Sequence, residues 1–137
     1  MAFDIERVEY YNATVEGHAG EASRLLSLFA EAGVSLLAYK AAPLEGMRTR
    51  FTLLPDDASR MGNGASKAGL SLDGPHPALY VRGDDQSGAL ADIFEKLGQA
   101  QIGLSESTGL ADIKGGYGVI LYLDREDCER AAAALQV

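Results

Sequence analysis

An apolar stripe that occurs twice with identical spacing is the feature of this chain that most constrains its fold. After Gly20 the apolar residues stand at 22, 25, 26 and 29, and after Gly88 they stand at 90, 93, 94 and 97. Both series follow the i, i+3, i+4, i+7 spacing with which an amphipathic helix buries one face. The sequence therefore predicts an internal repeat built around two related helices. The larger side chains of both stripes are expected to face a sheet: Leu25, Leu26, Phe29, Ile93, Phe94 and Leu97.

Strand signals surround each predicted helix in the same order. The segments expected to form strands are 10–16, 34–36 and 50–54 in the first copy, and 78–82, 102–104 and 119–123 in the second. Glycine-containing hairpin turns at 45–46 and 114–116 precede the third strand of each copy. Acidic residues from Asp56 and from Glu126 then favour the start of a second helix.

The end of each copy is less regular. Gly62, Gly64 and Gly69 each cost about 1 kcal/mol relative to alanine in a helix interior, so the second helix of the first copy is expected to be short or frayed. Residues 70–72 alternate like a fourth strand, and 73–77, with two prolines, are expected to form a linker. Because the sequence ends at Val137, the second copy is expected to lack a free-standing fourth strand.

The order strand, helix, strand, strand, helix, strand is a split βαβ arrangement. We therefore predict an α+β protein with two ferredoxin-like βαββαβ modules in tandem, residues 1–73 and 74–137, each an antiparallel sheet with both helices on one face. Modules of about 65 residues bury small cores and leave open sheet edges. Pairing of the modules within the chain and a homodimer are therefore expected.

The second copy resembles the start of an ACT domain at residues 81–94, VRGDDQSGALADIF, where a strand, a short acidic loop and a Gly-small-Leu helix start precede an amphipathic helix. Residues 31–36, EAGVSL, are similar to the Ala-Gly-Ile-Asn-Ile turn that follows this helix in ACT domains. The two copies span nearly the whole chain, which thus resembles a stand-alone tandem ACT protein. The common Asp-Arg-Pro-Gly loop is DQSG at 85–88 and GHAG at 17–20.

The resemblance implies a regulatory protein that binds an amino acid or a similar small ligand between paired modules. It implies no catalysis and no cofactor, and an output through a regulated partner protein or through oligomerisation. The implied ligand contacts lie in the loop before the first helix of each copy and at the start of the second strand: Gly17, His18, Gly20, Ser35, Asp84, Asp85, Gln86, Ser87, Gly88, Ala89 and Leu90.

The chemistry of the second loop suits a zwitterion. The start of a helix presents unpaired N–H groups and the positive end of its dipole, so the amides of 88–90 could bind a carboxylate. Asp84 or Asp85 could hold an ammonium group by a charge-assisted hydrogen bond. A simpler interpretation stays open, because Ser87 or Asp85 would equally well cap the helix.

Two other functional hypotheses also stay open. A ligand-free scaffold that serves only dimerisation fits the missing Asp-Arg-Pro-Gly pattern. A small enzyme of acylphosphatase type would need an arginine in the loop before the first helix, and neither 17–20 nor 84–88 contains one.

Composition excludes several partners. The net charge of −8, from 20 acidic and 12 basic residues, repels nucleic acid and anionic membranes, and no apolar run reaches the length of about 20 residues that a membrane helix needs. Cys128 is the single cysteine, which excludes an internal disulfide and fits a cytoplasmic protein. Only two histidines occur, without acidic residues at ligand spacing, so no metal site is expected.

Overall fold

The computed structural model describes residues 3–17, 19–84, 88–112 and 114–136, and it divides the chain into two compact units. The N unit is Glu9–His76, and the C unit is Met1–Val8 together with Pro77–Val137. The sequence predicted modules 1–73 and 74–137. The structure differs from this division because the first eight residues belong to the unit that the second half of the chain forms.

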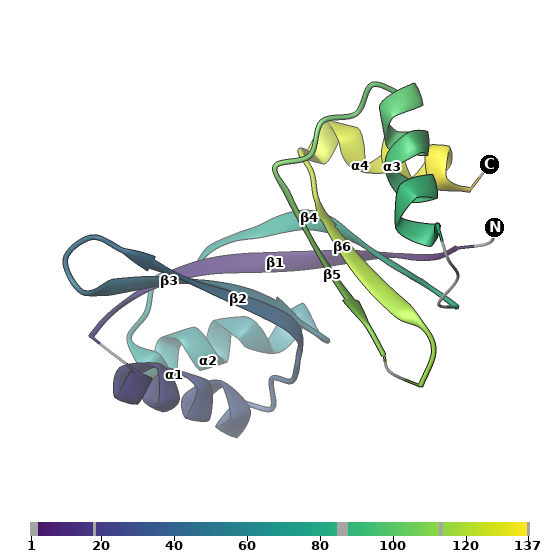
Figure 1. Cartoon of the computed structure of the whole chain (residues 1–137). Helices are drawn as coiled ribbons and strands as arrows, with labels where there is room; N and C mark the ends of the chain where they lie inside the picture. Colours follow the sequence, from purple (N-terminus) through teal and green to yellow (C-terminus); the bar gives the residue numbers. More distant parts are fainter. Residues whose placement is uncertain (1–2, 18, 85–87, 113, 137) are drawn as a thin grey trace. The chain divides into compact units, whose positions relative to one another are not determined.

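The N unit contains the complete order βαββαβ. Its elements are the second part of β1 (Asp4–Glu16), α1 (Ala19–Glu31), β2 (Leu36–Leu44), β3 (Arg48–Pro55), the short 3₁₀ helix η1 (Ala58–Arg60), α2 (Met61–Ala68) and the first part of β4 (Asp73–Gly83). The strand order is β2-β3-β1-β4, and β3 pairs antiparallel with both β2 and β1. Figure 1 shows α1 and α2 on one face of these strands.

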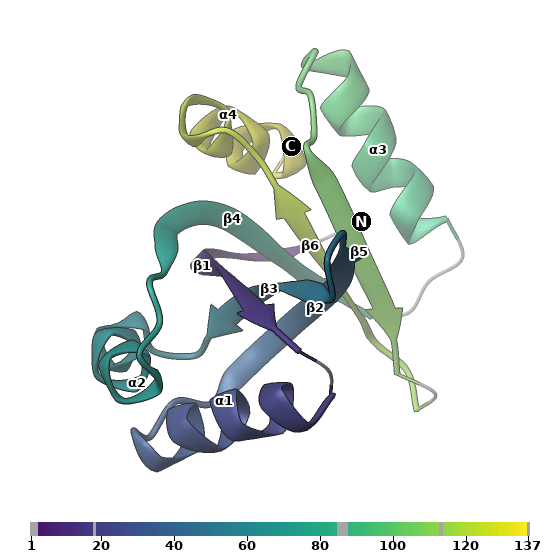
Figure 2. The ribbon, with the colours of Figure 1, turned by 90° about the vertical axis from the view of Figure 1, so that its left-hand side faces the viewer.

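The C unit reaches the same set of elements with a different chain order. It combines the first part of β1 with the second part of β4, α3 (Ala89–Gln99), β5 (Glu106–Ala111), β6 (Tyr117–Tyr122) and α4 (Arg125–Leu135). The strand order is β1-β4-β6-β5, and β6 pairs antiparallel with β4 and β5. Figure 2 shows α3 and α4 beside β5 and β6 from a second direction. The fourth strand of this unit thus comes from residues that precede the strand segment of the first copy.

Side-chain contacts hold this first segment in the C unit. Arg7 donates from Nε to Oε1 of Glu129 on α4 at 2.8 Å, and Arg82 on β4 donates from Nη2 to Oδ2 of Asp4 at 3.0 Å. Ile5 packs against the core of the C unit. The start of β1 is therefore an integral strand of this unit.

Each unit has its own hydrophobic core between its sheet and its helices. Leu25 and Phe29 of α1 pack with Phe51, Leu53 and Met61 in the N unit. The core of the C unit is formed by residues of β4, α3, β6 and α4 with Ile102: Leu79, Val81, Ile93, Leu97, Ile102, Val119, Leu121, Leu123, Cys128, Ala131, Ala132 and Leu135. Both sequence stripes therefore contribute to cores.

Two stripe residues do not face a sheet as predicted. Leu26 is 37% exposed and Phe94 is 41% exposed, although Leu25, Phe29 and Ile93 are buried. The reason is helical geometry, because successive residues point about 100° apart and only one of two neighbours can face the centre of the sheet. The error occurs at the same position in both helices.

Two segments predicted from alternation and the predicted linker are also placed differently. Residues 70–72 and 102–104 are not strands, and 73–77 belongs to β4 and is not a linker. The N–H groups of Val34, Leu70 and Ile102 each donate, at 3.0 Å, to the carbonyl five residues earlier, at the end of a helix. This is the Schellman bond, and an apolar residue at its donor position packs back against the helix. The alternation at these points therefore reflects helix termination.

Other predictions hold. The hairpin turn at 45–46 joins β2 to β3, and the predicted strands 50–54 and 119–123 lie in β3 and β6, apart from Leu123, which follows β6. The second helix of the first copy is short, since α2 has eight residues after η1. Asp57 is the N-cap of η1 and accepts from the N–H of Ser59 at 3.0 Å.

Candidate functional site

The predicted loop of the N unit begins at a tight glycine turn. Gly17 closes β1, its N–H donates to the carbonyl of Met47 at 2.9 Å, and its φ is +103°. A Cβ added here would lie 2.6 Å from Cγ of Glu21 in the first turn of α1. Both facts require glycine at this position. Gly20 lies in the first turn of α1 and is exposed. His18 lies outside the described residues.

The predicted loop of the C unit is described only at its two ends. Asp84 is exposed, Gly88 is the N-cap of α3 with φ +89°, and Asp85, Gln86 and Ser87 lie outside the described residues. The carbonyl of Gly88 accepts from the N–H of Asp92 at 2.9 Å, and this bond begins the helix. Ala89 is buried and Leu90 is exposed.

A tyrosine that the sequence analysis did not single out lies at the base of this second loop. The hydroxyl of Tyr117 is buried without a hydrogen-bond partner in the described part of the chain. It occupies the space beside Gly83, where an added Cβ would lie 2.7 Å from the hydroxyl oxygen. Burial raises the pKa of Tyr117, and the negative charges of Asp92 and Asp84 raise it further.

Ser35 and the 84–90 loop belong to different units. Ser35 is exposed, and its carbonyl accepts from the N–H of Asp56 at 2.8 Å within the N unit. Its predicted approach to the loop of the C unit stays a prediction.

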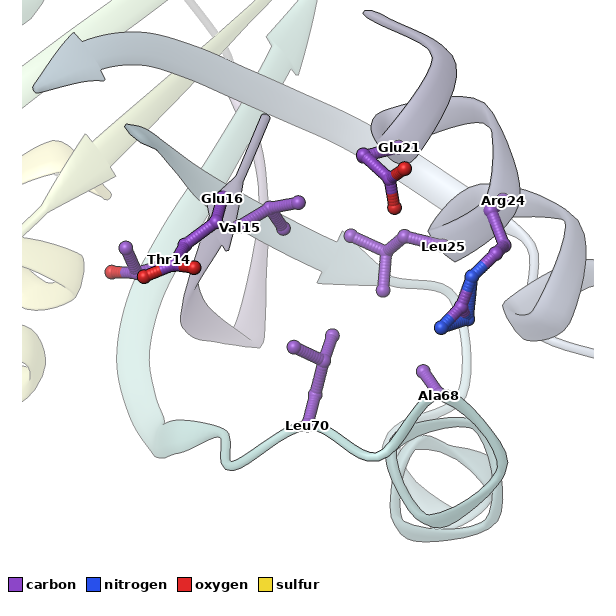
Figure 3. Close-up of a pocket in the computed structure, with 8 residues that line it drawn as sticks. All are labelled: Thr14, Val15, Glu16, Glu21, Arg24, Leu25, Ala68 and Leu70. Atoms are coloured by element: carbon purple, nitrogen blue, oxygen red, sulfur yellow. The ribbon is translucent and has the colours of Figure 1, made fainter. Parts of the chain in front are cut away.

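A pocket of about 240 Å³ opens in the N unit between β1, α1 and the end of α2 (Figure 3). Its lining combines apolar and polar side chains: Val15, Leu25, Ala68 and Leu70 with Thr14, Glu16, Glu21 and Arg24. Glu16 directly precedes the first predicted loop, and Glu21 directly follows it. The pocket therefore adjoins the loop 17–20 that the sequence predicted to bind a ligand. No sequence motif predicted its apolar wall.

The single cysteine of the chain lies in the core of the C unit. Cys128 is buried, and burial raises the pKa of its thiol, as does the charge of Glu129 beside it. A reactive thiolate is disfavoured there. The described residues contain no group of three His, Cys, Asp or Glu side chains that could hold a metal ion. Within the same residues, no helix is long and apolar enough to cross a membrane.

Comparisons with known proteins identify the fold. No family model and no curated protein matches the sequence. A solved protein from Bacteroides thetaiotaomicron superposes with a TM-score of 0.81 at 12% identity, covering 96% of this chain and 88% of that one. The ligand-free regulatory subunit of aspartate kinase from Thermus thermophilus gives 0.66 at 15% identity, covering 98% and 93%. A structure of aspartokinase alpha and beta subunits gives 0.63 at 18% identity, covering 98% and 95%.

These similarities establish an α+β fold of the ACT type, as the resemblance in the sequence implied. Because the sequence identities are low, the comparisons identify the fold alone. Any ligand or partner has to be inferred from the residues of this chain.

Proposed function

We propose that this protein is a regulatory module that binds an amino acid or a similar small ligand and acts through a partner protein or a second copy, without catalysis. The observation that carries the proposal is the order of strand, glycine-containing loop and helix that both units share. Positive φ occurs at Gly17, where the first loop begins, and at Gly88, where the second loop ends. Such helix starts present N–H groups and a dipole that suit a carboxylate. The fold shared with a regulatory subunit of aspartate kinase supports a regulatory role.

The loop of the C unit offers the proposed ligand contacts. The amides of Gly88, Ala89 and Leu90 would bind the carboxylate, and Asp84 or Asp85 the ammonium group. Gln86 and Ser87 complete this loop, and Gly17, His18, Gly20 and Ser35 are the corresponding proposed contacts of the N unit. The hydroxyl of Tyr117, buried without a hydrogen-bond partner among the described residues, supports a polar role for the base of the loop.

A thermal-shift screen of the full chain against the twenty amino acids and common nucleotides tests this function. A ligand at 100 times its dissociation constant stabilises the folded state by about 2.7 kcal/mol. We expect at least one amino acid to raise the melting temperature, and nucleotides to leave it unchanged because the net charge is −8. Absence of any shift with all twenty amino acids would contradict the proposal.

A ligand-free dimerisation scaffold is the second candidate, and the exposed edge strands favour it. All residues of β5 are exposed, and Leu110 on it is 81% exposed. Such an edge invites pairing with a second copy. We expect a homodimer by sedimentation between micromolar and millimolar protein. A dimer that no amino acid stabilises would favour the scaffold.

A further inference from the structure

The pocket of the N unit lies where an alanine stands at the position that a leucine holds in the second copy of the repeat. The two second helices carry core-facing residues at the same spacing: Met61, Gly64, Ala65 and Ala68 on α2, and Cys128, Ala131, Ala132 and Leu135 on α4. Leu135 is fully buried, whereas its counterpart Ala68 is only partly buried and lines the pocket. Space that a leucine side chain occupies in the C unit is therefore open in the N unit.

The end of α2 holds this space open. Gly69 is the C-cap in the left-handed conformation, with φ +68°, and the N–H of Leu70 donates to the carbonyl of Ala65 at 3.0 Å. This bond fixes Leu70 beside the pocket. Figure 3 shows Leu70, Val15 and Leu25 pointing toward one another around the opening. The apolar wall is thus a product of ordered secondary structure.

The charged residues at the pocket also differ from their counterparts in the C unit. Arg24 corresponds to Asp92, whose carboxylate lies 3.3 Å from Nζ of Lys96 one turn later, where α1 carries Leu28. Among the described residues Arg24 has no hydrogen bond and no salt bridge. A guanidinium without a carboxylate partner therefore stands at the rim.

The same contrast holds for the two acidic residues. Glu21 corresponds to Ala89, which is buried, and Glu16 corresponds to Arg82, which binds Asp4 at 3.0 Å. Neither glutamate side chain has a hydrogen bond or an ion pair with the described residues. In the C unit these positions are apolar or paired. In the N unit they leave three charges around an apolar wall.

We propose that this pocket binds a free α-amino acid with a short aliphatic side chain. The guanidinium of Arg24 can take the carboxylate in a bidentate pair, and Glu21 with Glu16 can take the ammonium group. The apolar wall then receives the side chain. Two carboxylates beside one guanidinium disfavour phosphates, and about 240 Å³ is below the roughly 300 to 1,000 Å³ typical of pockets for drug-sized ligands.

This inference rests on the proposed ligand-binding function, but it places a ligand inside one unit, apart from the loop of the C unit. Calorimetry on the full chain with L-leucine tests it. Two analogues separate the charges, because 4-methylpentanoate lacks the ammonium group and 3-methylbutylamine lacks the carboxylate. We expect the dissociation constant of each analogue to be at least about tenfold higher than that of leucine, since each analogue loses one charge-assisted contact.

Two variants probe the pocket directly. Ala68→Leu restores the side chain of the C unit and should abolish leucine binding while the melting temperature is kept. Arg24→Gln should weaken binding about tenfold or more. Matched controls are Ala30→Leu and Glu31→Gln, exposed positions on α1 outside the pocket, which should bind leucine like the unchanged chain.

The outcomes separate the pocket from the function. Unchanged leucine binding in both Ala68→Leu and Arg24→Gln overturns the pocket, as does binding only of amino acids that have no aliphatic side chain, and in both cases the proposed function stands. Loss of leucine binding in Asp84→Asn with full binding in Ala68→Leu moves the ligand to the loop of the C unit and also overturns the pocket. Failure of every amino acid to bind overturns both proposals.

Discussion

The two units fill the space between their two helices with different pairs of side chains. In the N unit the ring of Phe29 on α1 lies against Gly64 on α2, so closely that an added Cβ would be 2.3 Å from Cδ1 of the ring. At the corresponding positions the C unit has Leu97 and Ala131, which belong to one core cluster. A larger side chain on one helix is thus balanced by a smaller one on the other. The repeat conserves the packing of each helix pair more closely than its residues.

The comparison also explains why α2 is the weaker helix. Gly64 is required by the ring of Phe29, and Gly69 by its positive φ at the C-cap. Gly62 has no such reason, because an added Cβ would meet no described atom within 4 Å. Two of the three glycines therefore lower helix propensity but serve another purpose, since Gly64 allows close packing and Gly69 ends the helix.

The largest effect is expected from removing the central side chain of either helix pair. Phe29→Ala should lower the free energy of unfolding by about 3 to 5 kcal/mol, and Leu97→Ala by about 2 to 5 kcal/mol, because both side chains are buried. Urea unfolding followed by circular dichroism measures both. A cost below about 1 kcal/mol for either would contradict the core assignment.

A swap between the units tests the balance itself. Gly64→Ala alone should cost about 1 to 3 kcal/mol through overpacking. Combined with Phe29→Leu it reproduces the pair of the C unit, and a double-mutant cycle should show that the leucine recovers part of this cost. Additive effects of the two substitutions would show that these side chains do not compensate each other.

A smaller, opposite effect is expected at the unconstrained glycine. Gly62→Ala should raise the free energy of unfolding by about 0.5 to 1 kcal/mol, because alanine loses less backbone freedom in a helix. Gly69→Ala is the matched control and should lower it, since the positive φ strains any L side chain. Thermal melts of both variants decide the matter. A destabilised Gly62→Ala would reveal a packing constraint that the structure does not show.

The smallest effect concerns an exposed carboxylate of the N unit. Hydrogen bonds from His76, at 2.9 Å, and from Asn12 lower the pKa of Asp73 below its usual 3.8. The folded state thus gains stability above pH 3.8, and the gain is lost as the pH falls through the lower folded pKa. The stability difference between the unchanged chain and Asp73→Asn should shrink on acidification. A constant difference between pH 6 and pH 2 would contradict this.

The sequence predicted the elements whose signals are local. The stripes placed α1 and α3, and the hairpin glycines with apolar runs placed β3 and β6. The sequence was wrong where an apolar residue that suggested a strand in fact ends a helix. Leu70 and Ile102 are such residues. The contribution of Asp4–Val8 to the C unit was not predictable, because strand pairing across the chain leaves no local pattern.

The candidate site shows the same division. The glycine loops were found because Gly20 and Gly88 occupy equivalent places in the repeat. Tyr117 and the pocket were missed, since the pocket side chains come from three elements. A signal was nevertheless present. Aligning the copies sets Ala68 against Leu135 and Arg24 against Asp92, so the first copy has a smaller side chain and a charge of opposite sign at two of the positions that line the pocket.

The division of β1 between the units has a consequence for synthesis on the ribosome. Every strand and helix of the N unit lies within the uninterrupted segment Glu9–His76, so this unit can form as soon as that segment has emerged. The C unit instead needs Asp4–Val8, which are made before the N unit, to pair with β4 after the whole N unit has been translated. Residues Asp4–Val8 thus stay without their partner strand until β4 has been made, and folding during synthesis proceeds from the inserted N unit to the C unit that encloses it in sequence.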